Sequence, residues 1–163
     1  MPQSYARVVL HTMYSTKYRN PLITKEIEAR LLRYKVGVLK DLGSHVIRIN
    51  AVEDHVHIIH TLPRTVTIAN LLKEVKTQST TFVKDNFAGF EDFYWQVGYG
   101  TFSVDYRKLD GLIRYVENQK EHHKSNLPHH SFEHEFKTML KAYGLEFDIK
   151  YLFPQDPLLR NAA

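Results

Sequence analysis

Residues 46–62 read VIRINAVEDHVHIIHTL and contain two strand-like segments around an acidic turn. Residues 46–52 alternate apolar and polar side chains, as a half-buried strand does. Residues 55–62 follow the turn at 53–54 and end at Pro63, which cannot continue a paired strand. The stretch therefore predicts an antiparallel hairpin, and the rest of the fold can be worked out from it.

The second strand of this hairpin carries His55-Val56-His57. Residues two apart on a strand point to the same face, so both imidazoles can reach one metal ion while Val56 faces the core. Imidazole is the commonest metal-binding side chain, although a histidine in a strand is more often a packed residue than a ligand. His60 lies an odd number of residues from His57, so we expect it on the opposite face in a structural role.

Outward from the hairpin, apolar periodicity predicts further strands and helices. They are a strand over 5–15, a helix over 23–42, a helix capped at Thr67, a strand over 94–104, and helices over 108–124 and 132–143. The order strand, helix, strand, strand, helix, strand is the split βαβ pattern. It predicts a ferredoxin-like, RRM-like α+β sandwich with an antiparallel sheet, helices on one face and an additional catalytic helix. We expect one domain over 1–143 and a tail over 144–163 that packs on the domain or on a partner subunit.

The helix predicted over 108–124 carries Tyr115 and Gln119. Residues four apart on a helix share a face, so the phenol and the amide can meet the same point. In such a pair, one side chain is usually packed in the core and the other is solvated. A glutamine oxygen can, however, also serve as a ligand of Mg²⁺ or Mn²⁺. Together with His55 and His57, the pair would form a phosphodiester-cleaving centre with a tyrosine nucleophile.

Composition narrows the function classes. The chain has 163 residues and no cysteine, which excludes disulfides, thiolate catalysis and cysteine-ligated metal sites. Its net charge of +4 favours a polyanionic partner such as nucleic acid. It has no apolar signal core and no run of about 20 apolar residues, so we expect a cytoplasmic protein without a membrane partner.

Several segments together resemble one family. They are MPQSY at 1–5, VEDHVH at 52–57, WQVGYGTFSV at 95–104 and YVENQKEHHK at 115–124. This set resembles the HUH single-tyrosine transposases of small bacterial insertion sequences, the transposase IS200-like family, which act on single-stranded DNA. The resemblance covers nearly all of the first 143 residues.

The resemblance implies a role for each matching residue. His55, His57 and Gln119 would bind a divalent metal, Mg²⁺ or Mn²⁺, and Tyr115 would be the nucleophile that forms a 5′-phosphotyrosine intermediate. It also implies a homodimer that cuts and rejoins single-stranded DNA at element ends, which are expected to form hairpins. Whether Tyr115 acts in its own subunit or in its partner's stays open at this point.

Other residues are weaker candidates. Basic side chains that could hold DNA are Lys17, Arg19, Arg64, Lys73, Lys76, Lys84, Arg107 and Lys108, and aromatic ones that could stack on bases are Tyr94, Trp95, Tyr99 and Phe102. Aromatic residues of a strand are more often core. We expect Glu53 and Asp54 to form the turn, and either could also orient an imidazole. We expect five further histidines to be solvated surface residues: His122, His123, His129, His130 and His134.

Two other functions fit the same fold. One is a non-catalytic RRM-like nucleic-acid-binding module, or a domesticated transposase relative. It does not need the histidine, glutamine and tyrosine set, and the sequence lacks an RNP signature. The other is a metal-dependent hydrolase of small phosphodiesters, which would use water in place of Tyr115.

Overall fold

A single antiparallel sheet forms the centre of the protein. The computed structural model describes residues 3–124 and 130–157. The strands are β1 (Val9–Ser15), β2 (Val46–Ala51), β3 (His55–Thr61) and β4 (Gly100–Ser103). Their spatial order is β2-β3-β1-β4, and all neighbours are antiparallel. This is the predicted ferredoxin-like order, with the hairpin of β2 and β3 at one side.

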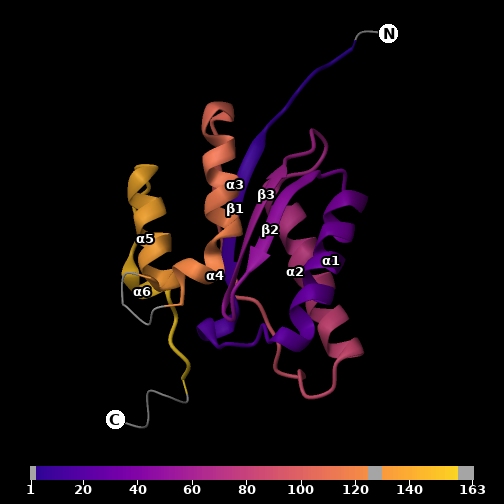
Figure 1. Ribbon diagram of the computed structural model, residues 1–163, viewed down its shortest axis with the longest axis vertical. Helices are drawn as coiled ribbons and strands as arrows, with labels where there is room; N and C mark the ends of the chain where they lie inside the picture. Colours follow the sequence, from indigo (N-terminus) through magenta and orange to yellow (C-terminus); the bar gives the residue numbers. More distant parts are fainter. Residues whose placement is uncertain (1–2, 125–129, 158–163) are drawn as a thin grey trace.

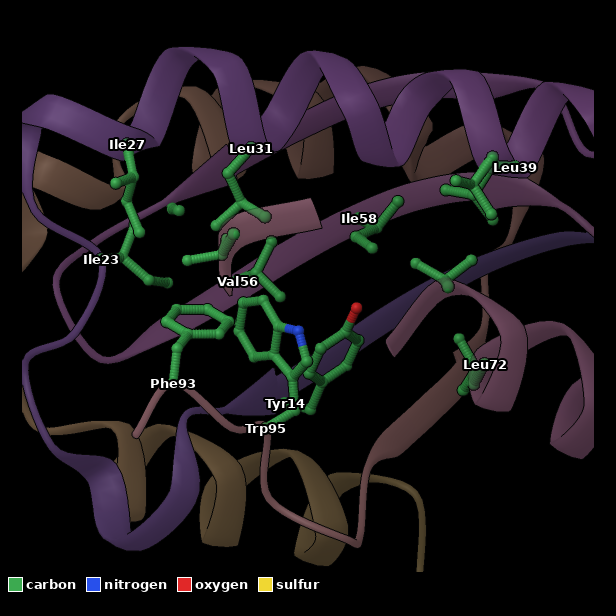
Figure 2. Close-up of a cluster of buried hydrophobic side chains, with 14 of the residues drawn as sticks. Tyr14, Ile23, Ile27, Leu31, Leu39, Val56, Ile58, Leu72, Phe93 and Trp95 are labelled. Atoms are coloured by element: carbon green, nitrogen blue, oxygen red, sulfur yellow. The ribbon is translucent and has the colours of Figure 1, made fainter. Parts of the chain in front are cut away.

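Two long helices cover one face of the sheet (Figure 1). They are α1 (Lys25–Asp41) and α2 (Ile68–Asn86), and Thr67 caps α2 as predicted by accepting a hydrogen bond from the Asn70 amide at 3.2 Å. Tyr14 and Val56 point from the sheet into the core beneath these helices, where Trp95 also packs (Figure 2). The larger of the hydrophobic clusters thus lies on the face opposite His55 and His57.

The C-terminal third of the chain covers the other face. Its helices are η2 (Tyr106–Lys108), α3 (Leu109–Glu117), α4 (Gln119–His122), α5 (Phe132–Ala142) and α6 (Ile149–Leu152), and a short η1 (Lys17–Arg19) follows β1. Val116 of α3 packs in one cluster with Ile59 of β3, and Phe136 of α5 packs in another with Met13 of β1. The sheet is therefore enclosed on both faces, and α3 and α5 lie over the histidine face (Figure 1).

Three predicted elements differ from the structure. In the strand expected over 94–104, Gly100–Ser103 forms β4 and Trp95 forms an isolated antiparallel bridge with Thr16. Residues 97–99 between them are not in a strand, and the Lys76 ammonium binds the carbonyls of residues 96, 97 and 98 at 2.8–3.0 Å. The helix expected over 108–124 is divided at Asn118, whose φ of −91° and ψ of 12° are not helical. The first strand also begins at Val9, after exposed residues 5–8.

The described part of the tail contacts the domain. Phe153 follows α6 and is buried with Phe132 and Phe136 of α5. The Gln96 amide also donates to the Leu152 carbonyl at 3.1 Å. The domain boundary at 143 stays a prediction, and residues 158–163 of the tail lie outside the described residues. Among the residues that are described, no helix is long and apolar enough to cross a membrane.

Candidate metal and tyrosine site

Strand β3 presents its histidines as the alternation predicts. His55 and His57 are fully buried on the face that α3 and α5 cover, with their ring centroids 5.1 Å apart. His60 points to the other face, where its Nε2 lies 2.8 Å from Thr12 Oγ1. The two-residue period of the strand thus separates the pair from the structural histidine.

Tyr115 and Gln119 reach the same place despite the break between α3 and α4. The Tyr115 hydroxyl donates a hydrogen bond to Glu135 Oε1, and the Gln119 amide nitrogen donates to the same oxygen at 3.1 Å. The ring of Tyr115 lies 6.1 Å from the ring of His57, centroid to centroid. The structure therefore brings the predicted residues together around one carboxylate.

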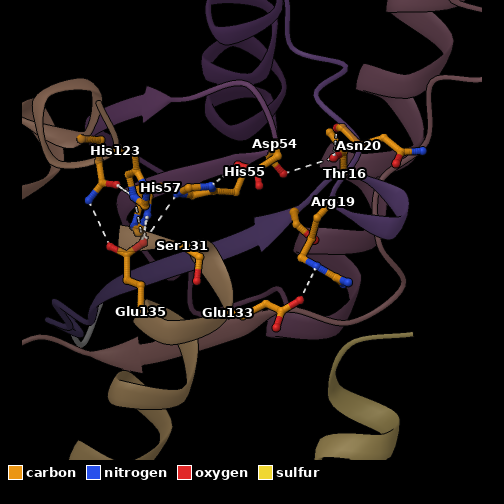
Figure 3. A network of polar contacts seen from close by, with 12 residues as sticks. Thr16, Arg19, Asn20, Asp54, His55, His57, His123, Ser131, Glu133 and Glu135 are labelled. Atoms are coloured by element: carbon orange, nitrogen blue, oxygen red, sulfur yellow. Dashed lines mark hydrogen bonds and ion pairs between the residues drawn. The ribbon is translucent and has the colours of Figure 1, made fainter. Parts of the chain in front are cut away.

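That carboxylate, Glu135, is a residue that the sequence analysis missed. It lies on α5, is only 6% exposed, and its Oε2 is 3.5 Å from His55 Nε2 and 3.3 Å from His57 Nε2 (Figure 3). Phe132 and Phe136 share the buried face of α5 with Glu135. A charged residue at helical spacing within this apolar face was the available signal, because an acidic side chain is rarely buried without partners.

His123 corrects one expectation. We expected solvated surface there, but its side chain is only 12% exposed, and its Nε2 lies 2.9 Å from Gln119 Oε1 and 3.4 Å from Glu135 Oε2. The reason is helical spacing, because His123 lies four residues after Gln119 and shares its face. His122 stacks on His130, with the ring centroids 5.0 Å apart. His134 is exposed, as expected, and His129 lies outside the described residues.

Two further side chains orient the histidine rings. Asp54 Oδ1 contacts His55 Nδ1 at 2.6 Å, so Asp54 does more than form the turn. His11 of β1 contacts His57 Nδ1 through its Nε2 at 2.8 Å. Because Asp54 and His11 contact the Nδ1 atoms of the two rings, the Nε2 atom of each ring faces Glu135. Such outer contacts fix the tautomer and orientation of metal-binding histidines.

The ionisable side chains of the site shift one another's pKa values. We call the site the polar cluster, and it consists of His55, His57, Gln119, His123 and Glu135. Burial lowers the pKa of His55, but contacts with Asp54 and Glu135 outweigh burial and raise it to about 9. Burial raises the pKa of Glu135, but His57 and His55 outweigh it and lower the value to about 2. Burial lowers the pKa of His57, and burial together with His55 lowers that of His123 to about 4. Glu135 is thus an anion among imidazoles.

The donor atoms of the polar cluster fit a cation. Within residues 3–124 and 130–157, the buried atoms His55 Nε2, His57 Nε2 and Glu135 Oε2 have no hydrogen-bond partner. Leaving such atoms unpaired in the interior is costly, whereas a metal ion would satisfy them together. The ligand atoms of His55, His123 and Glu135 also lie within 4.8 Å of one another. Imidazole nitrogen and carboxylate oxygen are common ligands of divalent metals.

A separate groove gathers some of the weaker candidates on the other side of the sheet. Lys73, Lys76, Lys84, Tyr94 and Tyr99 line this α2 groove, which has a volume of about 590 Å³. The ammonium of Lys84 lies 3.4 Å from the centroid of the Tyr94 ring. The groove therefore combines positive charge with exposed aromatic rings.

The remaining DNA-binding candidates are buried, paired with an acidic side chain, or exposed outside the set of residues that line this groove. Trp95 and Phe102 are buried, so they belong to the core, as aromatic residues of a strand usually do. Arg19 pairs with Glu133 at 2.9 Å, and Arg107 pairs with Asp105 at 2.8 Å. Lys17 is exposed beside Tyr94, with its Nζ 5.5 Å from the ring centroid, and Arg64 and Lys108 are exposed.

Comparisons with known proteins agree with this arrangement. A comparison with curated proteins gives no significant match. A proposed transposase from Deinococcus radiodurans R1 has a similar structure, with a TM-score of 0.60, 19% identity, and coverage of 73% of this chain and 96% of that one. A REP-associated tyrosine transposase bound to a REP hairpin has a TM-score of 0.57 and 16% identity, with 96% of both chains covered. At these identities, the two structures establish the fold.

The sequence itself establishes the family. The model of the family described as "Transposase IS200 like" matches residues 4–119, which include β1 to β4 and the Tyr115 and Gln119 pair. The match covers well over half of the chain. The protein belongs to the IS200-like transposase family.

Proposed function

We propose that this transposase cleaves and rejoins single-stranded DNA through Tyr115, with a divalent metal held by His55, His57 and Gln119. The observation that supports the proposal most is the convergence of these residues on one buried carboxylate. A packed tyrosine and a solvated glutamine would not need to meet two histidines from a distant strand. Membership of the transposase family gives the reaction its substrate class.

The reaction follows from the groups present. The Tyr115 phenol gives up its proton as its oxygen attacks the scissile phosphorus, the bond from phosphorus to the 3′ oxygen breaks, and the departing 3′ oxygen takes up a proton, so that no proton is gained or lost overall. The product is a 5′-phosphotyrosyl enzyme with a free 3′-hydroxyl. A divalent metal, Mg²⁺ or Mn²⁺, would neutralise charge that builds on the phosphate oxygens. Because the new linkage is itself a phosphodiester, a 3′-hydroxyl can reverse the step and join new ends.

The substrate is proposed to be a hairpin-forming single strand. One structural neighbour is a tyrosine transposase bound to a REP hairpin, and the excess of basic residues in this chain suits a nucleic acid. The α2 groove would hold unpaired nucleotides, because lysines neutralise phosphates and exposed tyrosines stack on bases. A homodimer, implied by the resemblance to HUH transposases, remains part of the proposal.

The test is the Tyr115→Phe variant. The purified protein is incubated with Mn²⁺ and a labelled hairpin oligonucleotide, and covalent adducts are separated on a denaturing gel. We expect Tyr115→Phe to bind the oligonucleotide and to form no adduct, whereas Tyr106→Phe, an exposed tyrosine of η2, forms it as the wild type does. An equal amount of adduct in Tyr115→Phe would refute the assignment.

The same variant separates the other functions. A hydrolase that used water would keep cleaving DNA in Tyr115→Phe and would give no adduct in the wild type. A binding module or an inactive relative would give neither cleavage nor adduct in either protein. The outer contacts of His55 and His57 favour a catalytic metal site over the binding module, since a module of that kind has no use for oriented imidazoles.

A further inference from the structure

We propose that Glu135 is a ligand of the same metal ion and that its second oxygen positions Tyr115, so that one carboxylate joins the metal to the nucleophile. This inference rests on the proposed function, because it adds a ligand to the metal site proposed there. Neither the sequence pattern nor the match over residues 4–119 reaches Glu135. The residue belongs to α5, beyond the matched region.

The first argument is the spacing of the donor atoms. Glu135 Oε2 lies 3.5 Å from His55 Nε2 and 3.3 Å from His57 Nε2. Atoms that each lie roughly 2.1 Å from one ion are roughly 3.0 Å apart in an octahedron and roughly 3.4 Å apart in a tetrahedron. Each of the two histidine nitrogens is therefore already at the distance from Glu135 Oε2 that two neighbouring ligands of one metal ion have.

The second argument is that these contacts are not hydrogen bonds. His55 Nε2, His57 Nε2 and Glu135 Oε2 are all buried and all lack a hydrogen-bond partner among the described residues. The Nδ1 atoms of both histidines are engaged by Asp54 and His11, so Nε2 is the atom left for a ligand. A buried carboxylate oxygen needs a positive charge beside it, and a metal ion between these atoms would supply that charge in place of a protonated His55.

The third argument is that the two carboxylate oxygens of Glu135 contact different groups. Oε1 accepts hydrogen bonds from the Tyr115 hydroxyl and from the Gln119 amide, while Oε2 faces the histidines. A carboxylate can serve a metal with one oxygen and hold a phenol with the other. Glu135 would thus fix the distance between the nucleophilic oxygen and the metal.

The rigidity of α5 supports this role. Phe132 and Phe136, on either side of Glu135 in the chain, are buried in a cluster with Met13 of β1 and Phe102 of β4. Ser131 caps the helix by accepting a hydrogen bond from the His134 amide at 3.2 Å. Ligands on packed elements hold their geometry better than ligands on loops.

The experiment measures Mn²⁺ binding directly, without DNA, by electron paramagnetic resonance of the free ion and by calorimetry. Five variants are compared with the wild type: Glu135→Gln, Glu135→Asp, Glu133→Gln, His57→Ala and Tyr115→Phe. Glutamine keeps the size of Glu135 and an acceptor for Tyr115 but loses the charge. Glu133 is the matched control, because it lies on the same helix and pairs with Arg19 away from the polar cluster.

We expect Glu135→Gln and His57→Ala each to weaken Mn²⁺ binding by at least about tenfold, and Glu133→Gln and Tyr115→Phe to bind as the wild type does. Glu135→Asp, which retains the charge, should recover part of the affinity. Wild-type affinity in Glu135→Gln together with a loss in His57→Ala would overturn the role of Glu135 and leave the proposed metal site standing. Wild-type affinity in both variants would overturn both proposals.

The positioning role has its own readout. At saturating Mn²⁺, Glu135→Gln should lower the rate constant of adduct formation while the Kd for the hairpin oligonucleotide stays within about twofold of wild type. Near-ultraviolet circular dichroism of the aromatic cluster around α5 verifies that the variant is folded. A wild-type rate constant in folded, metal-saturated Glu135→Gln would overturn the positioning role.

Discussion

Lys35 is an unusual residue of the core. It lies on α1, is fully buried, donates a hydrogen bond to the Tyr14 hydroxyl at 2.5 Å, and its Nζ lies 3.9 Å from the centroid of the Trp95 ring. No carboxylate pairs with it in the described part of the chain. Burial and the nearby Lys76 hold the pKa of Lys35 well below its ordinary 10.5. The folded protein therefore releases the proton of this amine at a lower pH than the unfolded chain does.

This burial predicts how stability depends on pH. Between the lowered pKa of the folded protein and pH 10.5, Lys35 holds more proton in the unfolded chain than in the folded protein, so unfolding takes up a proton. The free energy of unfolding should therefore rise with pH, by up to about 1.4 kcal/mol per pH unit from this one group, and the gain should end above pH 10.5. At low pH the free energy of unfolding no longer depends on Lys35 titration, because the folded protein also protonates Lys35.

Urea unfolding between pH 8 and pH 10 tests the prediction with Lys35→Met. The variant should show a smaller rise in the free energy of unfolding with pH than the wild type, while Lys40→Met, at an exposed position of α1, should keep the wild-type rise. An identical pH dependence in Lys35→Met would contradict the lowered pKa of Lys35. The comparison is of slopes, so the loss of the bond to Tyr14 does not affect it.

At the scale of single residues, the sequence predicts which candidate ligands come together better than it predicts their surroundings. His55 and His57 follow from strand alternation, and the Tyr115 and Gln119 pair follows from helical spacing. Glu135 could not be placed in the same site, because no local pattern says which face of the sheet α5 covers. His11 was missed for a similar reason, since it meets His57 only across the pairing of β1 with β3.

The contact between β4 and α5 depends on Gly100. A Cβ atom at this position would lie 2.5 Å from Phe136 Cε2 and 2.9 Å from Phe102 Cε2, closer than real contacts allow. Phe136 follows Glu135 directly, so this contact also sets the depth at which α5 docks. The absence of a side chain at Gly100 is therefore tied to the geometry of the polar cluster.

Gly100→Ala should lower the free energy of unfolding by about 1–3 kcal/mol, because overpacking forces neighbouring side chains or the backbone to move. Gly37→Ala is a control of opposite sign. Gly37 lies in α1 with nothing within 4 Å of its missing Cβ, so alanine there should stabilise by about 0.5–1 kcal/mol. Urea midpoints of the two variants provide the test, and equal or increased stability of Gly100→Ala would contradict the close contact.

At the scale of elements, the order of strands and helices was predictable, but their ends were not. Periodicity located β2, β3, α1 and α2 to within a few residues. β4 is shorter than the strand expected over 94–104, and the Lys76 ammonium of α2 binds carbonyl oxygens that would otherwise accept hydrogen bonds in the sheet. The break at Asn118 likewise leaves no signal in the apolar spacing, since Val116 and Gln119 are both buried on either side of it.

The α2 groove predicts how the whole molecule responds to salt. Lys73 and Lys84 line the groove and are the proposed phosphate-binding residues, whereas Lys76 is engaged by backbone carbonyls. Removing both charges with Lys73→Gln and Lys84→Gln should weaken binding of a hairpin oligonucleotide with a single-stranded end. The slope of log Kd against log salt should fall by about 1.4, because each phosphate of a single strand that a lysine neutralises adds about 0.7 to this slope.

Titrations at several salt concentrations measure that slope. Lys25→Gln, at an exposed position of α1 away from the groove, is the matched control and should keep the wild-type slope. An unchanged slope in the double variant would mean that the DNA strand does not follow the groove. The strand would then have to be held elsewhere on this basic protein.

The polar cluster is complete within one chain, and this bears on how a dimer would work. Tyr115 contacts Glu135 of its own chain, and Glu135 faces His55 and His57 of the same chain. The hydroxyl thus needs no partner subunit to reach the site. The geometry points to attack in cis, the alternative that the sequence alone leaves open against attack in trans.

Mixing two inactive variants tests attack in cis. His57→Ala keeps the nucleophile and Tyr115→Phe keeps the metal ligands, so in cis neither subunit of a mixed dimer has a complete site. We expect no covalent adduct after the two proteins are unfolded together and refolded. Attack in trans would instead restore roughly a quarter of the wild-type sites, because half of randomly assorted dimers are mixed and each regains one of its two sites. Size-exclusion chromatography of the refolded mixture verifies that dimers are present, and adduct formation at that level would show that Tyr115 serves the partner subunit.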